Sequence, residues 1–125
     1  MSSVFINGLS GKMGIALKNL IQDEPNLEMV KTIKDSDLII DFSRPESTML
    51  IIQEAQEQKK PLIIGTTGFN ENEVKLIDEA SKNIPIVISF NMSKGIFYFK
   101  KNIKNFLKDN LDSFECTISE THHTE

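Results

Sequence analysis

The chain has 125 residues, a formal net charge of -4 and a single cysteine. This length suits about one domain, and the acidic balance argues against a nucleic acid or an anionic membrane as the partner. Without a charged leader, a long apolar run or a second cysteine, the sequence predicts a cytoplasmic protein with no membrane span and no internal disulfide.

A glycine-rich turn follows the first apolar run. Residues 4–6 predict a strand, and Gly8, Gly11 and Gly14 stand where this strand would give way to a helix. Glycine lets a ligand approach the backbone closely, and the unpaired N–H groups of a helix start suit a phosphate. The pattern departs from G-x-G-x-x-G because Ser10 replaces the second glycine. A phosphate-binding turn is the interpretation, with an ordinary turn that binds nothing as the alternative.

Helical and extended patterns alternate along the rest of the chain. Apolar periodicity predicts helices over 11–23, 43–60, 70–83 and 96–111, and strands over 4–6, 27–33, 38–42, 61–64, 85–88 and 114–119. Strands that alternate with helices are typical of an α/β fold with a doubly wound, mostly parallel sheet. We therefore expect residues 1–125 to form one dinucleotide-binding domain of Rossmann-type topology.

Several local features follow from the same periodicities. Capping boxes are expected at Ser43 with Glu46 and at Asn70 with Glu73. Cys116 falls on the apolar side of the last predicted strand and should be a packed thiol. The apolar face of the first predicted helix comprises Met13, Ala16, Leu17 and Leu20. That of the last predicted helix comprises Ile96, Phe99, Ile103, Phe106 and Leu107.

Polar or glycine-rich loops follow four of the predicted strands. They span residues 8–14, 41–45, 65–68 and 89–95, and parallel strands would open all four at one edge of the sheet, where doubly wound folds bind ligands. Lys12 would add a positive charge beside phosphates, Thr66 and Thr67 would offer hydroxyl and N–H groups to a ribose or nicotinamide, and Asn91 would offer a donor and an acceptor. Taken singly, each is an ordinary turn residue.

The second predicted strand ends in residues that bear on cofactor choice. A dinucleotide site of the NAD type usually places an acidic residue about 20 positions beyond the glycines, on the ribose 2′-hydroxyl. Lys34 would favour a 2′-phosphate, whereas Asp35 could serve the hydroxyl. We predict NADPH as the cofactor, with NADH tolerated.

Two adjacent histidines, His122 and His123, stand near the end of the sequence. Neighbouring side chains in an extended chain point to opposite sides, so one metal ion would not bind both, and no metal site is predicted. A solvated tail and a role in proton transfer near neutral pH both remain open.

Five motifs in order and spacing resemble the dihydrodipicolinate reductase family, now called 4-hydroxy-tetrahydrodipicolinate reductase. They are Gly-Leu-Ser-Gly-Lys-Met-Gly (8–14), Ile-Asp-Phe-Ser-Arg-Pro-Glu (40–46), Gly-Thr-Thr-Gly-Phe (65–69), Asn-Met-Ser-Lys-Gly (91–95) and Glu-Thr-His-His (120–123). The resemblance implies NAD(P)H-dependent reduction of a cyclic, unsaturated dicarboxylate in diaminopimelate and lysine synthesis.

The resemblance also implies a role for each matching residue. The cofactor contacts would be Gly8, Leu9, Ser10, Gly11, Lys12 and Met13 at the pyrophosphate, Gly65, Thr66 and Thr67 beside the nicotinamide, and Ser89, Phe90, Asn91 and Met92 around the rest of the pocket. His122 would match the catalytic histidine, and His123 would contact the substrate.

The chain departs from the family pattern in three ways. Lys12 replaces the common arginine, the acidic ribose ligand is not evident, and the sequence stops at Glu125, before the expected lysine, Asp-Ala-Pro-Ser-Gly-Thr segment and substrate domain. We expect weak nucleotide binding and little turnover, because these residues match only the cofactor-binding half of the family. We also expect no tetramer, because the family tetramer forms through the substrate domain. A non-catalytic dinucleotide-binding module is the alternative, and the sequence beyond residue 125 would discriminate between the two.

Overall fold

The computed structural model describes residues 1–110, 112–113 and 115–121. It divides into two compact units, Met1–Asn91 and Met92–Glu125. The first unit contains a sheet with three helices, and the second contains one long helix, after which none of the described residues belongs to a helix or strand.

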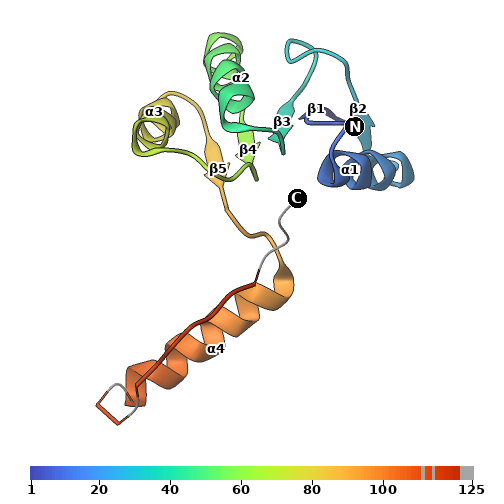
Figure 1. Ribbon diagram of the computed structural model, residues 1–125. Helices are drawn as coiled ribbons and strands as arrows, with labels where there is room; N and C mark the ends of the chain where they lie inside the picture. Colours follow the sequence, from blue (N-terminus) through green and yellow to red (C-terminus); the bar gives the residue numbers. More distant parts are fainter. Residues whose placement is uncertain (111, 114, 122–125) are drawn as a thin grey trace. The chain divides into compact units, whose positions relative to one another are not determined.

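The first unit is a parallel five-stranded sheet in the order β2-β1-β3-β4-β5. Helix α1 lies on one face, and α2 and α3 lie on the other (Figure 1). The strands are β1 (Ser2–Asn7), β2 (Leu27–Met29), β3 (Leu38–Asp41), β4 (Leu62–Ile64) and β5 (Ile86–Ile88), and the helices are α1 (Lys12–Asp23), α2 (Pro45–Gln58) and α3 (Glu71–Ser81). The predicted doubly wound α/β fold is confirmed.

Two apolar clusters cover the two faces of this sheet. The cluster under α1 contains Val4, Ile6 and Ile21, with Ile40 packed against it. The cluster under α2 and α3 contains Ile39 from the same strand as Ile40, so β3 is covered on both faces, as its unbroken apolar run predicted. No helix joins β2 to β3; instead, the described loop places Ile33 in the second cluster.

The buried face of α1 differs from the prediction. Gly14 and Ile21 are buried, whereas the side chains of Met13 and Leu20 are 47% and 65% exposed. A Cβ at position 14 would lie 2.1 Å from the carbonyl oxygen of Gly8, so α1 meets the glycine turn at a residue without a side chain. A hydrophobic pattern does not register a contact that depends on the absence of a side chain.

One of the two predicted capping boxes is present. At the start of α3, the Asn70 side chain accepts from the backbone N–H of Glu73 at 3.0 Å, and the Glu73 side chain accepts from the Asn70 N–H at 2.8 Å. The box at Ser43 is wrong, because Arg44 is the N-cap of α2 and its side chain makes no capping bond. The Ser43 hydroxyl instead donates to the carboxylate of Asp41 at 2.6 Å.

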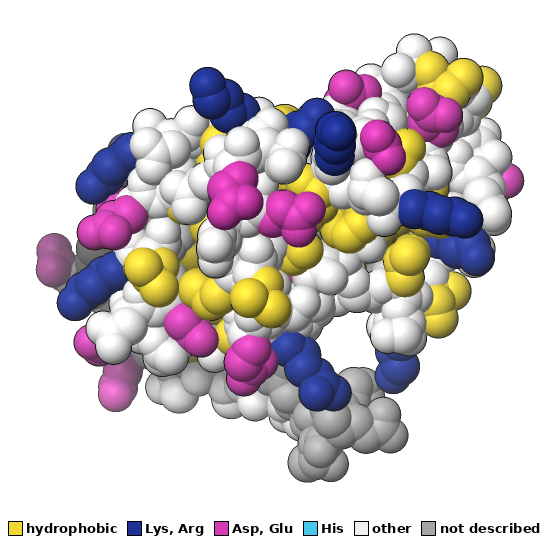
Figure 2. All heavy atoms as spheres, turned by 90° about the horizontal axis from the view of Figure 1, so that it is seen from above, with side chains coloured by type: hydrophobic (Ala, Val, Ile, Leu, Met, Phe, Trp, Pro, Cys, Tyr) yellow, Lys and Arg dark blue, Asp and Glu magenta, His cyan; other side chains and the backbone are white. Residues whose placement is uncertain are grey.

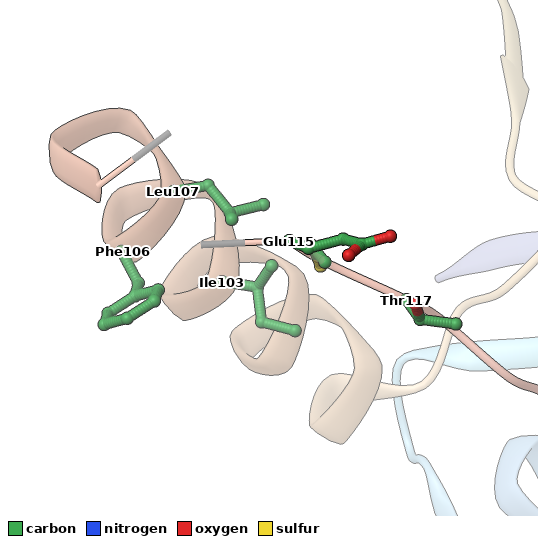
Figure 3. A pocket seen from close by; sticks show the side chains of 6 residues that line it. Ile103, Phe106, Leu107, Glu115 and Thr117 are labelled. Atoms are coloured by element: carbon green, nitrogen blue, oxygen red, sulfur yellow. The ribbon is translucent and has the colours of Figure 1, made fainter. Parts of the chain in front are cut away.

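The second unit begins with α4 (Lys94–Asn110). Within the described chain none of the residues of α4 is buried, although its periodicity predicted a core-facing side. The predicted strand over 114–119 is also wrong for the residues the structure describes, since none of residues 115–121 belongs to a strand. Residues 115–117 lie along α4 (Figure 3), whose backbone groups are bonded within the helix and offer no ladder partner.

A recess of about 290 Å³ lies between α4 and the segment that follows it (Figure 3). Cys116 is exposed there, so the prediction of a packed thiol is wrong. The lining residues are Ile103, Phe106, Leu107, Glu115, Cys116 and Thr117.

Candidate functional site

Four strands end in register at one edge of the sheet. Asn7 pairs with Asp41, Asp41 with Ile64, and Ile64 with Ile88, and these are the last residues of β1, β3, β4 and β5. The predicted loops that follow these strands therefore leave the sheet at the same level. The sheet order reverses between β1 and β3, so the glycine turn and the loop after β3 flank the switch point. The prediction that these loops share an edge is confirmed.

The three glycines of the turn have different structural roles. Gly8 has φ of +92°, and a Cβ there would lie 2.2 Å from the Phe42 carbonyl oxygen. Gly14 is equally crowded, as described above. A Cβ on Gly11, in contrast, would meet its nearest described neighbour, the Gly8 carbonyl oxygen, at 3.5 Å, which is an ordinary contact. The fold requires glycine at positions 8 and 14 but not at position 11.

The start of α1 has the properties of an anion site. Its N-cap is Gly11, which has no side chain to bond the first N–H groups, and its first turn contains no acidic residue. Helix α3, in comparison, begins with a capping box and has Glu71 and Glu73 in its first turn. A helix start without a capping side chain, together with the positive end of the α1 dipole, therefore favours a negatively charged ligand. Leu9, Ser10, Lys12 and Met13 are exposed around this helix start.

The two threonines after β4 differ in what they can offer to a ligand. Thr66 is 3% exposed; its hydroxyl donates to Asp41 Oδ2 at 2.8 Å and accepts from the Ser43 N–H at 2.8 Å. These bonds occupy the hydroxyl that the sequence assigned to a ribose or nicotinamide. Thr67 is exposed. Gly65 lies under the ring of Phe42, where a Cβ would come within 2.1 Å of a ring carbon.

The loop after β5 completes the edge within the first unit. The Ser89 N–H donates to the carbonyl of Ile64 at 3.0 Å, and the Ser89 hydroxyl donates to the carbonyl of Asn91 at 3.0 Å. The side chain of Phe90 is 60% exposed. Met92, the last of the predicted contacts in this loop, belongs to the second unit.

The structure does not bring Lys34 to this edge. The hydroxyl oxygen of Ser3 lies 2.9 Å from the carbonyl oxygen of Asp35, which places the residue after Lys34 beside the second residue of β1. Roughly 13 Å of extended strand separates Ser3 from Asn7. Lys31 is closer in sequence than Lys34 to Met29, the last residue of β2. The next residue, Val30, is still bonded to β1, because its N–H donates to the Val4 carbonyl.

The predicted roles of His122 and His123 fall outside the described residues. Among the residues that the structure describes, no group of three or more histidine, cysteine, aspartate or glutamate side chains could hold a metal ion. No helix in the described part of the chain is long and apolar enough to cross a bilayer. On the face shown in Figure 2, acidic and basic side chains are interspersed among hydrophobic ones.

A buried carboxylate beneath this edge is the feature that the sequence interpretation missed. Asp41 is completely buried, and Asn7, Ser43, Thr48 and Thr66 all donate to it. A charged residue at the end of an otherwise apolar strand was the signal that could have identified it, because a charge is buried only when other groups satisfy it.

A doubly wound parallel sheet, with a glycine turn and a helix start at its switch point, defines a Rossmann-type α/β domain. The family model described as dihydrodipicolinate reductase, N-terminus, matches residues 29–92, just over half of the chain. The chain belongs to the dihydrodipicolinate reductase family.

Individual relatives agree with this assignment. The chain is 36% identical over 142 residues to the 4-hydroxy-tetrahydrodipicolinate reductase of Caldanaerobacter subterraneus, covering 98% of this chain and 56% of that protein. It is 41% identical over 110 residues to the protein of the same name from Aliarcobacter butzleri, covering 86% of this chain and 42% of that protein. The chain thus spans about half the length of the curated relatives it matches.

A solved structure shares the fold. Dipicolinate-bound dihydrodipicolinate reductase from Paenisporosarcina sp. TG-14 superposes with a TM-score of 0.71 at 18% identity, covering 86% of this chain and 54% of that one. At this identity the likeness supports the fold alone.

Proposed function

We propose that this chain is the nucleotide-binding part of a 4-hydroxy-tetrahydrodipicolinate reductase. The whole protein would reduce a cyclic, unsaturated dicarboxylate with NADPH or NADH in the diaminopimelate and lysine pathway of the cytoplasm. The observation that carries the proposal is Gly11, which none of the contacts among the described residues requires to be glycine. A glycine at the start of an uncapped helix keeps the backbone open to a ligand, and a bridging pyrophosphate matches the N–H groups there.

The residues of this chain would hold the cofactor in a definite order along the edge. The turn from Gly8 to Met13 would bind the pyrophosphate, the backbone of 65–67 and the exposed Thr67 would contact the nicotinamide side, and Ser89 to Met92 would complete the pocket. The bound nicotinamide supplies a hydride. We assign the matching proton to His122 and a substrate contact to His123, because imidazole exchanges protons near neutral pH.

Nucleotide titration of wild-type chain and Gly11→Val tests the turn. The valine side chain would occupy the space that a phosphate needs, so we expect binding of NADPH to weaken by about tenfold or more. The melting temperature should stay close to that of wild type, because the fold has room for a Cβ at this position.

Ala16→Val is the matched control for Gly11→Val. It introduces the same side chain on the same helix at an exposed position, and it should bind NADPH as wild type does. Equal binding by wild type and Gly11→Val would contradict the proposal, as would the absence of nucleotide binding by wild type.

Cofactor choice is tested by titrating NADPH and NADH in parallel. We expect NADPH to bind more tightly, with a lysine of the loop after β2 facing the 2′-phosphate. Because Lys34 lies toward the amino end of β1, Lys31→Ala should reduce NADPH affinity about two- to fivefold, and Lys34→Ala should change it less. A clear preference for NADH in wild type and in both variants would reject the proposed 2′-phosphate contact.

A further inference from the structure

The carboxylate of Asp41 connects three of the loops at the candidate site. Its Oδ1 atom lies 2.7 Å from Asn7 Nδ2 and 2.6 Å from Ser43 Oγ. Its Oδ2 atom lies 2.5 Å from Thr48 Oγ1 and 2.8 Å from Thr66 Oγ1. Each oxygen thus accepts from two donors, although the side chain has no contact with solvent.

The donors come from the segments that would contact the cofactor. Asn7 directly precedes Gly8, Ser43 lies in the loop after β3, and Thr66 lies in the turn after β4. Two bonds from backbone N–H groups also join the loop after β3 to the turn after β4. The Gly65 N–H donates to the carbonyl of Asp41 at 2.8 Å, and the Ser43 N–H donates to the Thr66 hydroxyl. One buried group therefore sets the relative positions of the glycine turn and the 65–67 turn.

An apolar side chain would cover this part of the sheet at lower cost than a charge. Ile39 on the same face of β3 and Ile64 beside Asp41 on β4 are both fully buried. Replacing buried charged groups by apolar residues of similar volume is often neutral or stabilising. An apolar residue cannot, however, orient three hydroxyls and an amide, so packing alone does not account for a carboxylate at this position.

We propose that Asp41 is a positioning residue for cofactor binding, acting through Thr66 and Asn7. This inference rests on the proposed function. The carboxylate holds the Thr66 hydroxyl and, through it, the Ser43 N–H, so that the backbone of the 65–67 turn is in place before the nicotinamide side of the cofactor arrives. Preorganised loops bind more tightly because less conformational entropy is lost on binding.

The donors and acceptors around Asp41 indicate which hydrogen bonds Asp41→Asn would disturb. The asparagine oxygen would stay with the Asn7 amide nitrogen, which can only donate, and its NH2 group would face the two threonine hydroxyls. Thr48 can turn its proton to the Arg44 carbonyl, which lies 3.1 Å away. Thr66 loses the acceptor that the structure gives it while still accepting from the Ser43 N–H. The 65–67 turn is therefore the segment that loosens.

Calorimetric titration of folded variants with NADPH tests this role. We expect Asp41→Asn to weaken NADPH binding about tenfold at temperatures well below its melting point. Thr66→Val keeps the shape of the side chain but lacks its hydroxyl, and it should weaken binding by a similar factor. The double variant should bind about as weakly as Asp41→Asn alone, because both changes remove the same interaction.

Asp37→Asn is the matched control. Asp37 also accepts two hydrogen bonds from a β1 residue, Ser3, but at the opposite end of that strand. It should lower the melting temperature while changing the NADPH dissociation constant much less than Asp41→Asn does, which separates positioning from general destabilisation.

Each outcome of these titrations decides one question. If wild type binds NADPH and either Asp41→Asn or Thr66→Val, as folded protein, binds it equally tightly, the positioning role is overturned and the proposed function stands. Equal weakening by Asp37→Asn would also overturn the role. If Asp41→Asn does not fold, Thr66→Val decides the matter. If wild type itself binds neither NADPH nor NADH, the proposed function fails, and the inference fails with it.

Discussion

Asp37 illustrates how a single exposed carboxylate connects the loop after β2 to β1. Its Oδ2 atom accepts from the Ser3 N–H at 2.8 Å and from the Ser3 hydroxyl at 2.8 Å. The bond from the Ser3 backbone N–H, followed by the bond from the Ser3 hydroxyl, lowers the pKa of Asp37 from its ordinary value of 3.8. Desolvation raises this pKa in part, and the positive charges of Lys60 and the N-terminus lower it further. The carboxyl group therefore releases its proton more readily in the folded chain than in the unfolded chain.

The lowered pKa of Asp37 predicts a pH-dependent contribution to stability. The contribution is fully present above the unfolded-state pKa and is lost as pH falls through the lower folded-state value. Asp37→Asn should thus melt at a lower temperature than wild type at pH 7, and the difference should shrink below about pH 4. Thermal melts of both proteins from pH 7 to pH 3 measure this effect. A difference that stays constant over that range would contradict it.

At the scale of elements, α4 differs from the helices of the sheet unit. Helix α2 buries Thr48, Ile51, Ile52 and Ala55, whereas α4 buries none of its residues within the described chain. Its large side chains are instead exposed, among them Phe97, Tyr98, Phe99 and Phe106. Tertiary packing supplies most helical stability in proteins, so α4 has little to hold it beyond its own backbone bonds.

Hydrogen exchange should reveal this difference between helices. We expect amides of α4 to exchange at least about tenfold faster than those in the middle of α2, because none of the residues that local opening of α4 would expose is fully buried within the described chain. Mass spectrometry of one sample compares both helices directly. Protection of α4 equal to that of α2 at every protein concentration would contradict the expectation, whereas protection that grows with concentration would indicate self-association through the exposed apolar side chains.

At the scale of the whole molecule, the sequence was sufficient to predict the fold and the shared edge of the loops that form the candidate site. Each strand of the sheet overlaps a predicted one, since short apolar runs between helical periods leave few alternatives in a parallel sheet, although β2 ends at Met29 and not at residue 33. The glycine turn and the loops after β3, β4 and β5 were expected at one edge for the same reason, and they lie there. That these loops bind a cofactor stays a prediction.

The features that the sequence did not reveal depend on contacts between distant residues. The buried side of α1 is set by Gly14 against Gly8, and the start of α2 is shifted because Asp41 takes the Ser43 hydroxyl. Thr66 was assigned to a ligand because its bond to Asp41, 25 positions away, leaves no local signature. The strand expected over 114–119 failed among its described residues because alternation indicates a face but does not supply a neighbouring strand.

The contact between the Phe42 ring and Gly65 has a consequence for how this domain can evolve. Any side chain at position 65 would collide with the ring, and a smaller residue at position 42 would leave the backbone of Gly65 uncovered. A bulkier residue at position 65 therefore requires that the aromatic ring at position 42 be displaced or lost first, whereas position 42 can change before position 65 does. Related sequences with a side chain at position 65 should thus lack an aromatic ring that packs there from position 42.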